Sequence, residues 1–147
     1  MSLSGDDWKT ISAKGDISVT DSERGIEINT ESLWFDREDE LLVISSWFEI
    51  DDTTEELYAQ AGSLRYDMKN EKLEMGMQVT LFKIADGEVM KCTSESVIYD
   101  KSSGMLTLKG GAKVVWKGDN YEAQIITVDT NDNTISLSGR IKGTING

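Results

Sequence analysis

SESVIYDKSSGMLTLKGGAKVVW, residues 94–116, contains two rows of alternating apolar and polar side chains on either side of a short polar turn. Val97 and Tyr99 lie on one face before the turn, and Leu106 and Leu108 continue that face after it. An alternation with a period of two predicts β-strands with one buried face. The aspartate that opens the turn agrees with this interpretation, because its side chain can hydrogen-bond the backbone that follows.

The same pattern recurs along the chain in about five copies of roughly 31 residues. An aromatic or apolar residue followed by aspartate marks each of four turns, and the aspartates are Asp36, Asp67, Asp100 and Asp129. We expect all four to be turn formers. Because the alternation recurs at matched columns, it predicts a stack of similar units, each too small to bury its own apolar row.

The row after each turn has the same columns in every copy. The first two columns are Ile11, Leu42, Leu73, Leu106 and Ile135, then Ala13, Ile44, Met75, Leu108 and Leu137. The fourth and fifth are Ile17, Phe48, Val79, Ala112 and Ile141, then Val19, Ile50, Leu81, Val114 and Gly143. The third column is small at Gly15, Ser46, Gly110 and Gly139 and is methionine at Met77. In KLEMGMQVTLF, residues 72–82, the alternation places Met77 on the same face as its apolar neighbours.

A shorter row precedes each turn, and its inward phase shifts once by an odd number of residues. Such a shift predicts a bulge or bend where one strand turns into the next. Residues 51–61, DDTTEELYAQA, contain a capping box between Thr53 and Glu56. They nevertheless align with strand-forming segments of the other copies, so we expect strands there and a solvated corner at residues 51–56.

The length of 147 residues is enough for one domain with a real core, and we expect a single domain over residues 1–147. Residues 1–7, MSLSGDD, resemble a tag or a disordered leader, and no signal peptide or membrane-spanning run is visible. Acidic residues outnumber basic ones 27 to 15, which gives a net charge of −12. This balance argues against nucleic acid as a partner and against an anionic membrane surface.

Few residues carry the chemistry of a catalytic or metal site. The chain has no histidine, which excludes a Ser–His or Cys–His nucleophile and a histidine-ligated metal. Residues 129–133, DTNDN, begin like a calcium loop, but Thr134 and Arg140 occupy positions where the loop needs glycine and glutamate. We therefore expect no enzymatic activity, no cofactor and no metal.

The single cysteine and the tryptophans have structural interpretations. Cys92 falls in an inward column and is expected to be a small buried hydrophobe. Trp8, Trp34, Trp47 and Trp116 mostly fall outside the inward columns. Exposed tryptophans could contact a protein partner or bind sugar, and we favour partner contact.

The repeated unit, a small residue, an aromatic–Asp turn and then L-x-L-x-G-x-V, resembles the repeat of the OstA-like family of lipopolysaccharide-transport proteins. Residues 94–116 match it best, and residues 61–82 depart from it by placing Met77 where the family has glycine. The resemblance extends from about Trp8 to Ile145. It implies an all-β, antiparallel, jellyroll-like stack in which two sheets form a rolled, open body with an apolar lumen. LptA-type bridge proteins and LptC-like domains both belong to this group.

The resemblance implies a periplasmic, non-enzymatic bridge that shelters acyl chains of lipopolysaccharide or a similar lipid on the way to the outer membrane. The residues expected to line the lumen are Leu42, Ile44, Phe48, Leu73, Met75, Val79, Leu106, Leu108 and Val114. The expected partners are the lipid and other OstA-like proteins or further copies, joined end to end by terminal strands. The anionic head group of lipopolysaccharide should be repelled by this acidic surface, so either the head stays in solvent or the cargo is another lipid.

Two other interpretations remain open. In the first, the apolar columns form a sealed core, and the protein is a structural β-repeat scaffold that assembles through its terminal strands. In the second, exposed tryptophans make the protein a carbohydrate-binding module.

Overall fold

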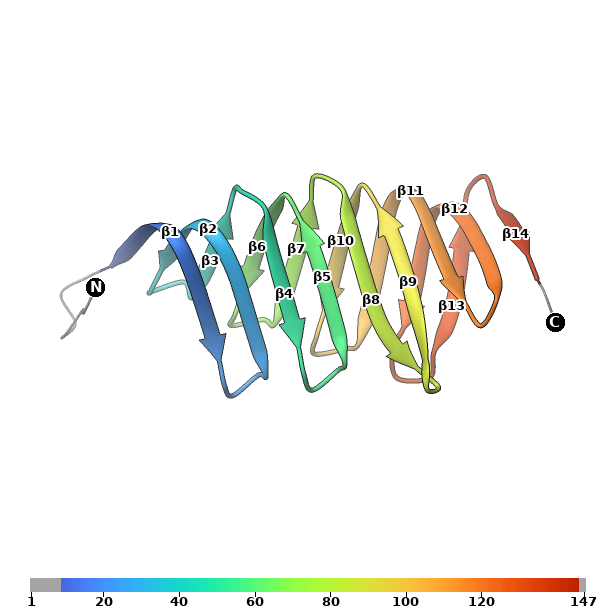
Figure 1. The fold of residues 1–147 in the computed structure, drawn as a ribbon, viewed down its shortest axis with the longest axis horizontal. Coiled ribbons are helices and arrows are strands. Elements are labelled where there is room, and N and C mark those ends of the chain that lie inside the picture. Colours follow the sequence, from blue (N-terminus) through green and yellow to red (C-terminus); the bar gives the residue numbers. More distant parts are fainter. Residues whose placement is uncertain (1–8, 146–147) are drawn as a thin grey trace.

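The computed structural model describes residues 9–145, which form antiparallel β-strands throughout and so confirm the all-β prediction. The body is elongated, with β1 at one end and β14 at the other (Figure 1). The strands are β1 (Thr10–Asp21), β2 (Ile26–Asp36), β3 (Leu41–Ile44), β4 (Phe48–Asp52), β5 (Leu57–Ala61), β6 (Ser63–Asp67), β7 (Lys72–Gly76), β8 (Val79–Ala85), β9 (Glu88–Ser94), β10 (Ser96–Asp100), β11 (Met105–Trp116), β12 (Asp119–Asp129), β13 (Thr134–Ser138) and β14 (Lys142–Thr144). The expected tag at residues 1–7 and Trp8 lie outside the described residues.

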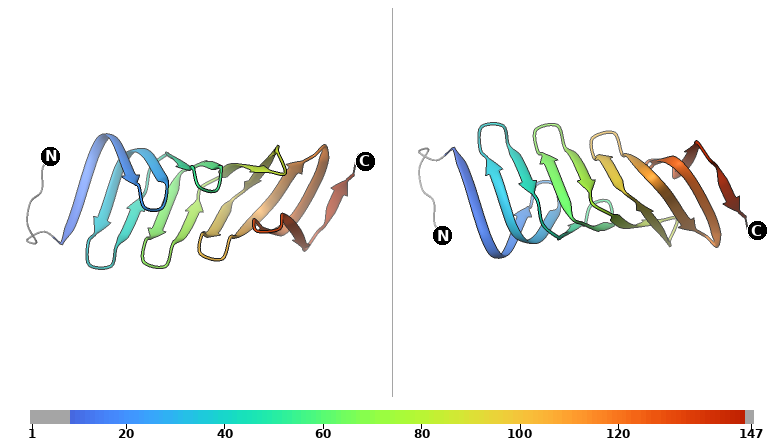
Figure 2. Two further views of the ribbon diagram at one scale, coloured as in Figure 1. Left: turned by 90° about the horizontal axis from the view of Figure 1, so that it is seen from below. Right: turned by 90° about the horizontal axis from the view of Figure 1, so that it is seen from above.

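The strands form two layers that share their long strands. β3, β6, β7 and β10 form one layer, called here the β6 layer. β4, β5, β8 and β9 form the other, called here the β5 layer. β2 pairs with both β3 and β4, and β11 pairs with both β10 and β9, so these bent strands join the layers. The layers extend together along the long axis (Figure 2).

One long edge of the body is a continuous corner, where the chain bends from one layer into the other. Register shifts between Lys14 and Ile17 in β1 and between Lys109 and Ala112 in β11 mark this corner. At Gly62 a single residue separates β5 from β6 and reverses which side chains point inward, which confirms the bend predicted for the shorter row. Residues 51–61 form the end of β4, a turn and β5, so the expectation of strands there is also confirmed.

The small third column of the repeat lies at this corner. Gly15, Gly110 and Gly139 have φ values of 110°, 84° and 76°, in the region that favours glycine. Met77 takes the corresponding bend with φ 61°, followed by Gln78 with φ 66°. Its side chain is 74% exposed, so the prediction that it shares the inward face is wrong. The reason is that a strand pattern assumes an extended backbone, whereas the chain turns through these two residues before Val79 points inward again.

The core lies between the layers and extends through the middle units. Side chains of β2 to β12 form one buried apolar cluster. The outermost rows are less covered, since Ile11, Ile17 and Ile135 are half-buried and Ile141 is 58% exposed. The first and last copies therefore lack the neighbour that covers each internal copy.

Candidate functional site: an apolar interior beneath a polar seam

The nine residues predicted to line a lumen lie together between the two layers. Each is at most 2% exposed, and all belong to the single core cluster. They come from both layers: Leu42, Ile44, Leu73 and Met75 from the β6 layer, Phe48 and Val79 from the β5 layer, and Leu106, Leu108 and Val114 from β11. Their alternate positions along each strand direct these side chains inward. The bend at the corner places the two layers opposite each other, so the side chains of both layers meet.

The interior is filled by its own side chains. Phe48, Tyr66 and Tyr99 are among the largest fully buried side chains and occupy the space between the layers. One open hollow of about 460 Å³ lies on the β6 layer and is lined by the outward side chains of Val43, Arg65 and Ile98 and also by the wall residues Ile44 and Met75. A guest molecule in the interior would therefore have to part the two layers or displace core side chains.

The long edge opposite the corner is closed differently, and we call it the seam. The turns at residues 37–40, 68–71, 101–104 and 130–133 end the β6 layer there, and those at 22–25, 53–56, 86–87 and 117–118 end the β5 layer. Backbone hydrogen bonds run along each row, such as Lys101 N to Glu71 O and Ile84 N to Glu56 O. Side chains connect one row to the other.

The first connection across the seam is a buried ion pair. Lys101 Nζ lies 2.8 Å from Asp52 Oδ2, and the Tyr99 hydroxyl donates to the same oxygen over 3.2 Å. The other carboxylate oxygen accepts the backbone N–H groups of Thr54 and Glu55. Asp52 is 1% exposed, so the expectation of a fully solvated corner at residues 51–56 is wrong at this residue. Its five hydrogen-bond donors compensate for its burial.

The second connection is made by Arg24. Its Nη1 is 2.9 Å from Asp21 Oδ2, and its Nη2 donates to the Met68 carbonyl in the opposite row over 3.1 Å. The Nε lies 3.4 Å from Glu71 Oε1, also in the opposite row. The hydrogen bond from Arg24 to the Asp21 carboxylate raises the pKa of Arg24, with Glu71 acting in the same direction. A third, longer contact joins Asn133 Nδ2 to Asp86 Oδ1 over 3.4 Å.

Burial controls the ionisation of the interior residues near the seam. Loss of solvent raises the pKa of Tyr66 and of Tyr99, and the nearby carboxylates Asp21 and Asp52, respectively, add to that effect. Burial also raises the pKa of Cys92 to about 12. The thiol is 1% exposed in β9, as expected for a small buried hydrophobe, and it is neutral and shielded.

The repeated aspartates act as predicted. Asp36, Asp67 and Asp100 accept backbone N–H groups three residues ahead, from Asp39, Asn70 and Ser103. Side-chain hydrogen bonds from Asn70 and Ser102 lower the pKa of Asp67 and Asp100, respectively. Asp129 accepts the N–H of Asn131, so the start of the calcium-like sequence is also a turn. Among residues 9–145, no group of three or more acidic or cysteine side chains is placed to hold a metal ion.

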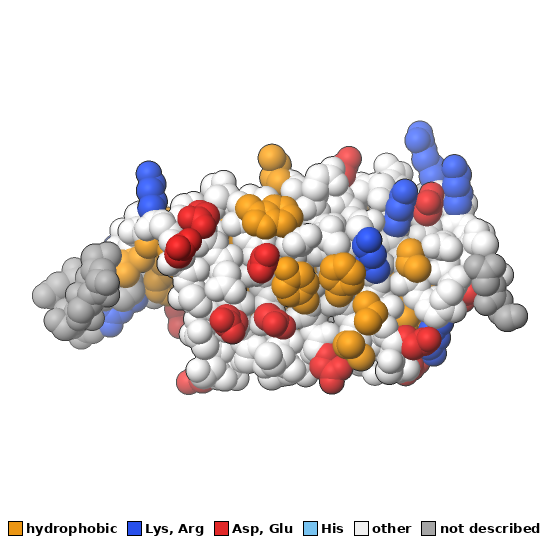
Figure 3. Space-filling view, in the orientation of Figure 1, with side chains coloured by type: hydrophobic (Ala, Val, Ile, Leu, Met, Phe, Trp, Pro, Cys, Tyr) orange, Lys and Arg blue, Asp and Glu red, His pale blue; other side chains and the backbone are white. Residues whose placement is uncertain are grey.

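The outer face of the β5 layer carries apolar side chains. Tyr58 and Phe82 pair across β5 and β8 with ring centroids 6.3 Å apart, and Ile84 and Val89 lie opposite each other on β8 and β9. Orange side chains gather across the middle of this face (Figure 3). Trp34 and Trp47 are 37% and 52% exposed, as their positions outside the inward columns indicated.

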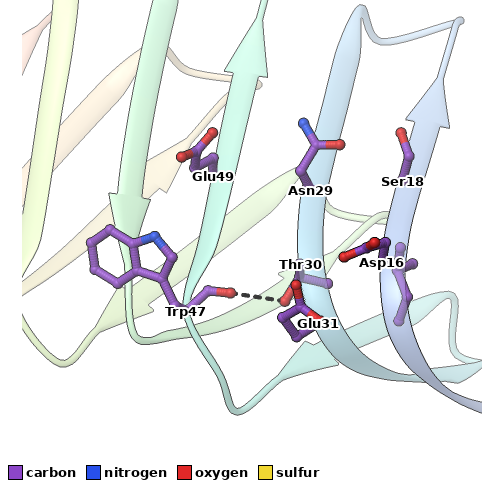
Figure 4. A pocket seen from close by; sticks show the side chains of 8 residues that line it. Asp16, Ser18, Asn29, Thr30, Glu31, Trp47 and Glu49 are labelled. Atoms are coloured by element: carbon purple, nitrogen blue, oxygen red, sulfur yellow. Dashed lines mark hydrogen bonds between the residues drawn. The ribbon is translucent and has the colours of Figure 1, made fainter.

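Trp47 borders an open pocket of about 370 Å³ on this outer face. Figure 4 places the indole on one side of it, Asp16 and Ser18 on β1 on the other, and Asn29 between them. An aromatic ring beside carboxylates and an amide offers both stacking and hydrogen bonding. Trp116, in contrast, is half-buried and donates its Nε1 hydrogen to the Ala85 carbonyl over 3.1 Å.

The alternating pattern predicted the apolar wall but gave no indication of the polar seam. Arg24 and Lys101 stand in turn segments, and Asp52 ends β4 within the corner that was predicted to be solvated. Their contacts join residues 44 to 49 positions apart, across the two layers. The one available signal was that Asp52 follows Phe48 and Ile50 in the inward alternation, which continues into the turn.

Comparison with known proteins gives a structural match. No family model matches the sequence, and no curated protein matches it. The crystal structure of LptH, the LptA-homologous periplasmic component of the lipopolysaccharide transport device of Pseudomonas aeruginosa, is similar over 94% of this chain and 95% of that chain. The TM-score is 0.60 and the sequence identity is 14%. The chain has an LptA-like β-jellyroll fold. Residues 9–145 contain no helical segment with the length and hydrophobicity needed to cross a membrane.

Proposed function

We propose that this protein is a periplasmic carrier that shelters the acyl chains of lipopolysaccharide or a similar lipid between its two layers. The observation that supports this function best is the asymmetry of the two long edges. Covalent chain joins the layers at the corner, whereas at the seam the described connections between the layers are side-chain contacts. The layers can therefore separate at the seam while the strand pairing within each layer stays intact.

The chemistry of the interior suits an acyl chain. The nine wall residues present only hydrocarbon and one thioether, and they continue from unit to unit along the long axis. Each CH₂ group moved from water into such an interior contributes about 0.8 kcal/mol. Because the interior is already packed, this gain has to offset the van der Waals attraction between the layers that is broken when they part. No reactive side chain is needed for this role.

The ends of the stack support assembly with similar proteins. Ile141 and Ile145 are 58% and 73% exposed near the last strands, and β1 pairs with β2 on one side. A further β-stack that added a strand at either end would cover these side chains and lengthen the interior. LptH is a periplasmic transport component of the same fold, which supports the periplasm as the compartment.

The net charge of −12 determines how a lipid would be held. Phosphate groups of a lipopolysaccharide head would be repelled by the acidic surface. The acyl chains therefore enter the interior while the charged head remains in solvent outside the seam.

Uptake of a fluorescent fatty-acid probe by the purified protein tests the proposal. We expect probe emission to rise on binding, lipopolysaccharide to displace the probe, and native mass spectrometry of protein from cells to detect bound lipid. A bound chain should also protect Cys92 from a thiol reagent, because this residue lies in the interior. Absence of both probe uptake and bound lipid would reject the carrier function.

The filled interior favours a second candidate, a structural scaffold. Its core would stay sealed, and its incompletely covered terminal units would join copies end to end. This candidate predicts oligomers whose size grows with protein concentration in analytical ultracentrifugation and which contain no lipid. Lipid uptake by the monomer would contradict it.

A further inference from the structure

Two buried hydrogen-bond donors at the seam have no acceptor. Among residues 9–145, the Tyr66 hydroxyl and the Arg24 Nε are the buried side-chain polar atoms without a hydrogen-bond partner. Tyr66 is fully buried on β6. Arg24 Nε is 3.4 Å from Glu71 in an ion pair, but that contact is not a hydrogen bond. Buried polar groups in folded proteins are normally hydrogen-bonded, so each of these donors calls for an acceptor that the described residues do not supply.

The two donors belong to the same part of the seam. Arg24 Nη2 donates to the carbonyl of Met68, two residues beyond Tyr66, so the guanidinium is held at the end of β6. The charge of Arg24 acts on the Tyr66 hydroxyl, where it favours loss of the proton. The Tyr66 hydroxyl in turn is one of the groups that raise the pKa of Arg24. Both residues therefore lie near the end of β6, where the buried strand meets the row of turns.

The surrounding charge selects the kind of acceptor. Asp21 and Glu71 flank Arg24, and Asp52, which is paired with Lys101, also acts on the Tyr66 hydroxyl. Burial raises the pKa of Tyr66, and these carboxylates raise it further. They would equally disfavour a carboxylate or phosphate of a ligand at this point. An uncharged oxygen can accept a hydrogen bond from a hydroxyl or a guanidinium without that repulsion.

We infer that Arg24 and Tyr66 bind the carbonyl oxygen of an acyl ester or amide whose hydrocarbon chain lies in the interior. This inference rests on the proposed function and narrows its ligand class to acyl-linked lipids. Free fatty acids carry a negative charge at this position, and ether lipids lack the carbonyl. The acyl linkage is also the point where an apolar chain meets a polar head, which matches the boundary position of the two donors.

A matched pair of lipids tests the inference. Monolauroylglycerol and dodecylglycerol ether have the same chain length and the same head, and they differ in the carbonyl. We expect the full chain to bind the ester about fivefold to tenfold more tightly than the ether, the size of one buried hydrogen bond. Laurate should bind more weakly than the ester because of its charge. Isothermal titration or displacement of a fluorescent probe measures each affinity.

Two tyrosine variants identify the donor. Tyr66→Phe removes the unpartnered hydroxyl and keeps the ring, so it should abolish the preference for ester over ether. Its melting temperature should be unchanged or higher, because no hydrogen bond is lost. Tyr99→Phe is the matched control: it removes a hydroxyl that donates to Asp52. It should lower the melting temperature and keep the ester preference.

Several results would overturn the inference. Equal binding of ester and ether by the unmodified chain would show that the carbonyl makes no specific contact, while leaving the carrier function in place. A loss of stability in Tyr66→Phe equal to that in Tyr99→Phe would show that the Tyr66 hydroxyl already has a partner. Failure of both lipids to bind would reject both the inference and the proposed function.

Discussion

Gly62 lies directly against Met77: a Cβ atom added to Gly62 would stand 2.7 Å from the Met77 Cβ. The next units have the opposite arrangement. A Cβ on Gly110 would be 2.9 Å from the Cβ of Glu95, and one on Gly139 would be 3.1 Å from the Cβ of Gln124. In each of these pairs one member is glycine and the other carries the side chain. Met77 thus fits the corner because its partner supplies the glycine that its own position lacks.

This relationship predicts non-additive mutations. Gly62→Ala should destabilise the protein by about 1–3 kcal/mol, because its Cβ would overlap with a Cβ that cannot swing away. In a Met77→Gly background, where the opposing side chain is absent, the same substitution should cost about 0.5 kcal/mol or less. Urea unfolding of the four proteins measures the coupling. Equal costs in both backgrounds would show that the two positions do not contact each other.

Asp52 and Asp51 are adjacent acids with opposite expected effects. Asp52 is buried and accepts from Lys101 and Tyr99, whereas Asp51 is exposed on the outer face. Asp52→Ala should destabilise the protein by about 3–5 kcal/mol, because it leaves a largely buried ammonium group without its partner. Asp51→Ala should change stability by about 0.5 kcal/mol or less. Similar unfolding midpoints for both variants would contradict a buried ion pair at the seam.

Opening of the seam can be followed at Cys92. This thiol is shielded in the interior, and burial raises its pKa to about 12, so a thiol reagent should react with it slowly in the native protein. Lys101→Met removes a connection across the seam and should speed the labelling of Cys92. Lys91→Met is the control, because Lys91 is exposed and precedes Cys92 on β9. If the labelling rate of Lys101→Met rises only by the factor that its loss of global unfolding free energy predicts, the reagent reaches Cys92 through global unfolding. That result would argue against local opening of the seam.

High pH should destabilise the protein through its interior tyrosines. The folded state raises the pKa of Tyr66 and Tyr99, mainly because burial disfavours the charged phenolate. Their contribution to stability is therefore complete below the unfolded tyrosine pKa of about 10 and is lost as the pH rises toward the folded values. Absorbance of tyrosinate and far-ultraviolet circular dichroism should report this together. Comparison with Tyr66→Phe and Tyr99→Phe assigns the tyrosinate absorbance to these two residues. If they ionise near pH 10 while the circular dichroism signal of the β-strands is intact, their burial is contradicted.

The alternation of the sequence was sufficient to predict which strand residues point inward. Leu73 and Met75, for example, are buried because a strand of period two in a stack has a single covered face. The turn aspartates were equally predictable, since Asp67 and Asn70 are close in sequence and their hydrogen bonds are local. These features depend on the backbone of one unit.

The features that were mispredicted or missed depend on contacts between segments that are not neighbours in the sequence. Met77 stands at a bend of the backbone opposite Gly62, which lies between β5 and β6. Asp52 is buried because Tyr99 and Lys101 approach it from the opposite layer. Neither contact leaves a periodic signal, because each is made once and joins segments whose proximity is set by the stacking of the layers.

The core distinguishes a carrier from a sealed scaffold. Leu106 is fully buried in β11, and Leu106→Ala should cost about 2–5 kcal/mol, because it removes apolar packing and leaves a cavity. The neighbouring Thr107→Ala, on the outer face, should cost far less. In a carrier, an acyl chain in the interior can fill the cavity, so saturating monolauroylglycerol should raise the melting temperature of Leu106→Ala more than that of the unmodified chain. In a sealed scaffold the lipid should not stabilise Leu106→Ala more than the unmodified chain, because it cannot reach the cavity that the substitution leaves.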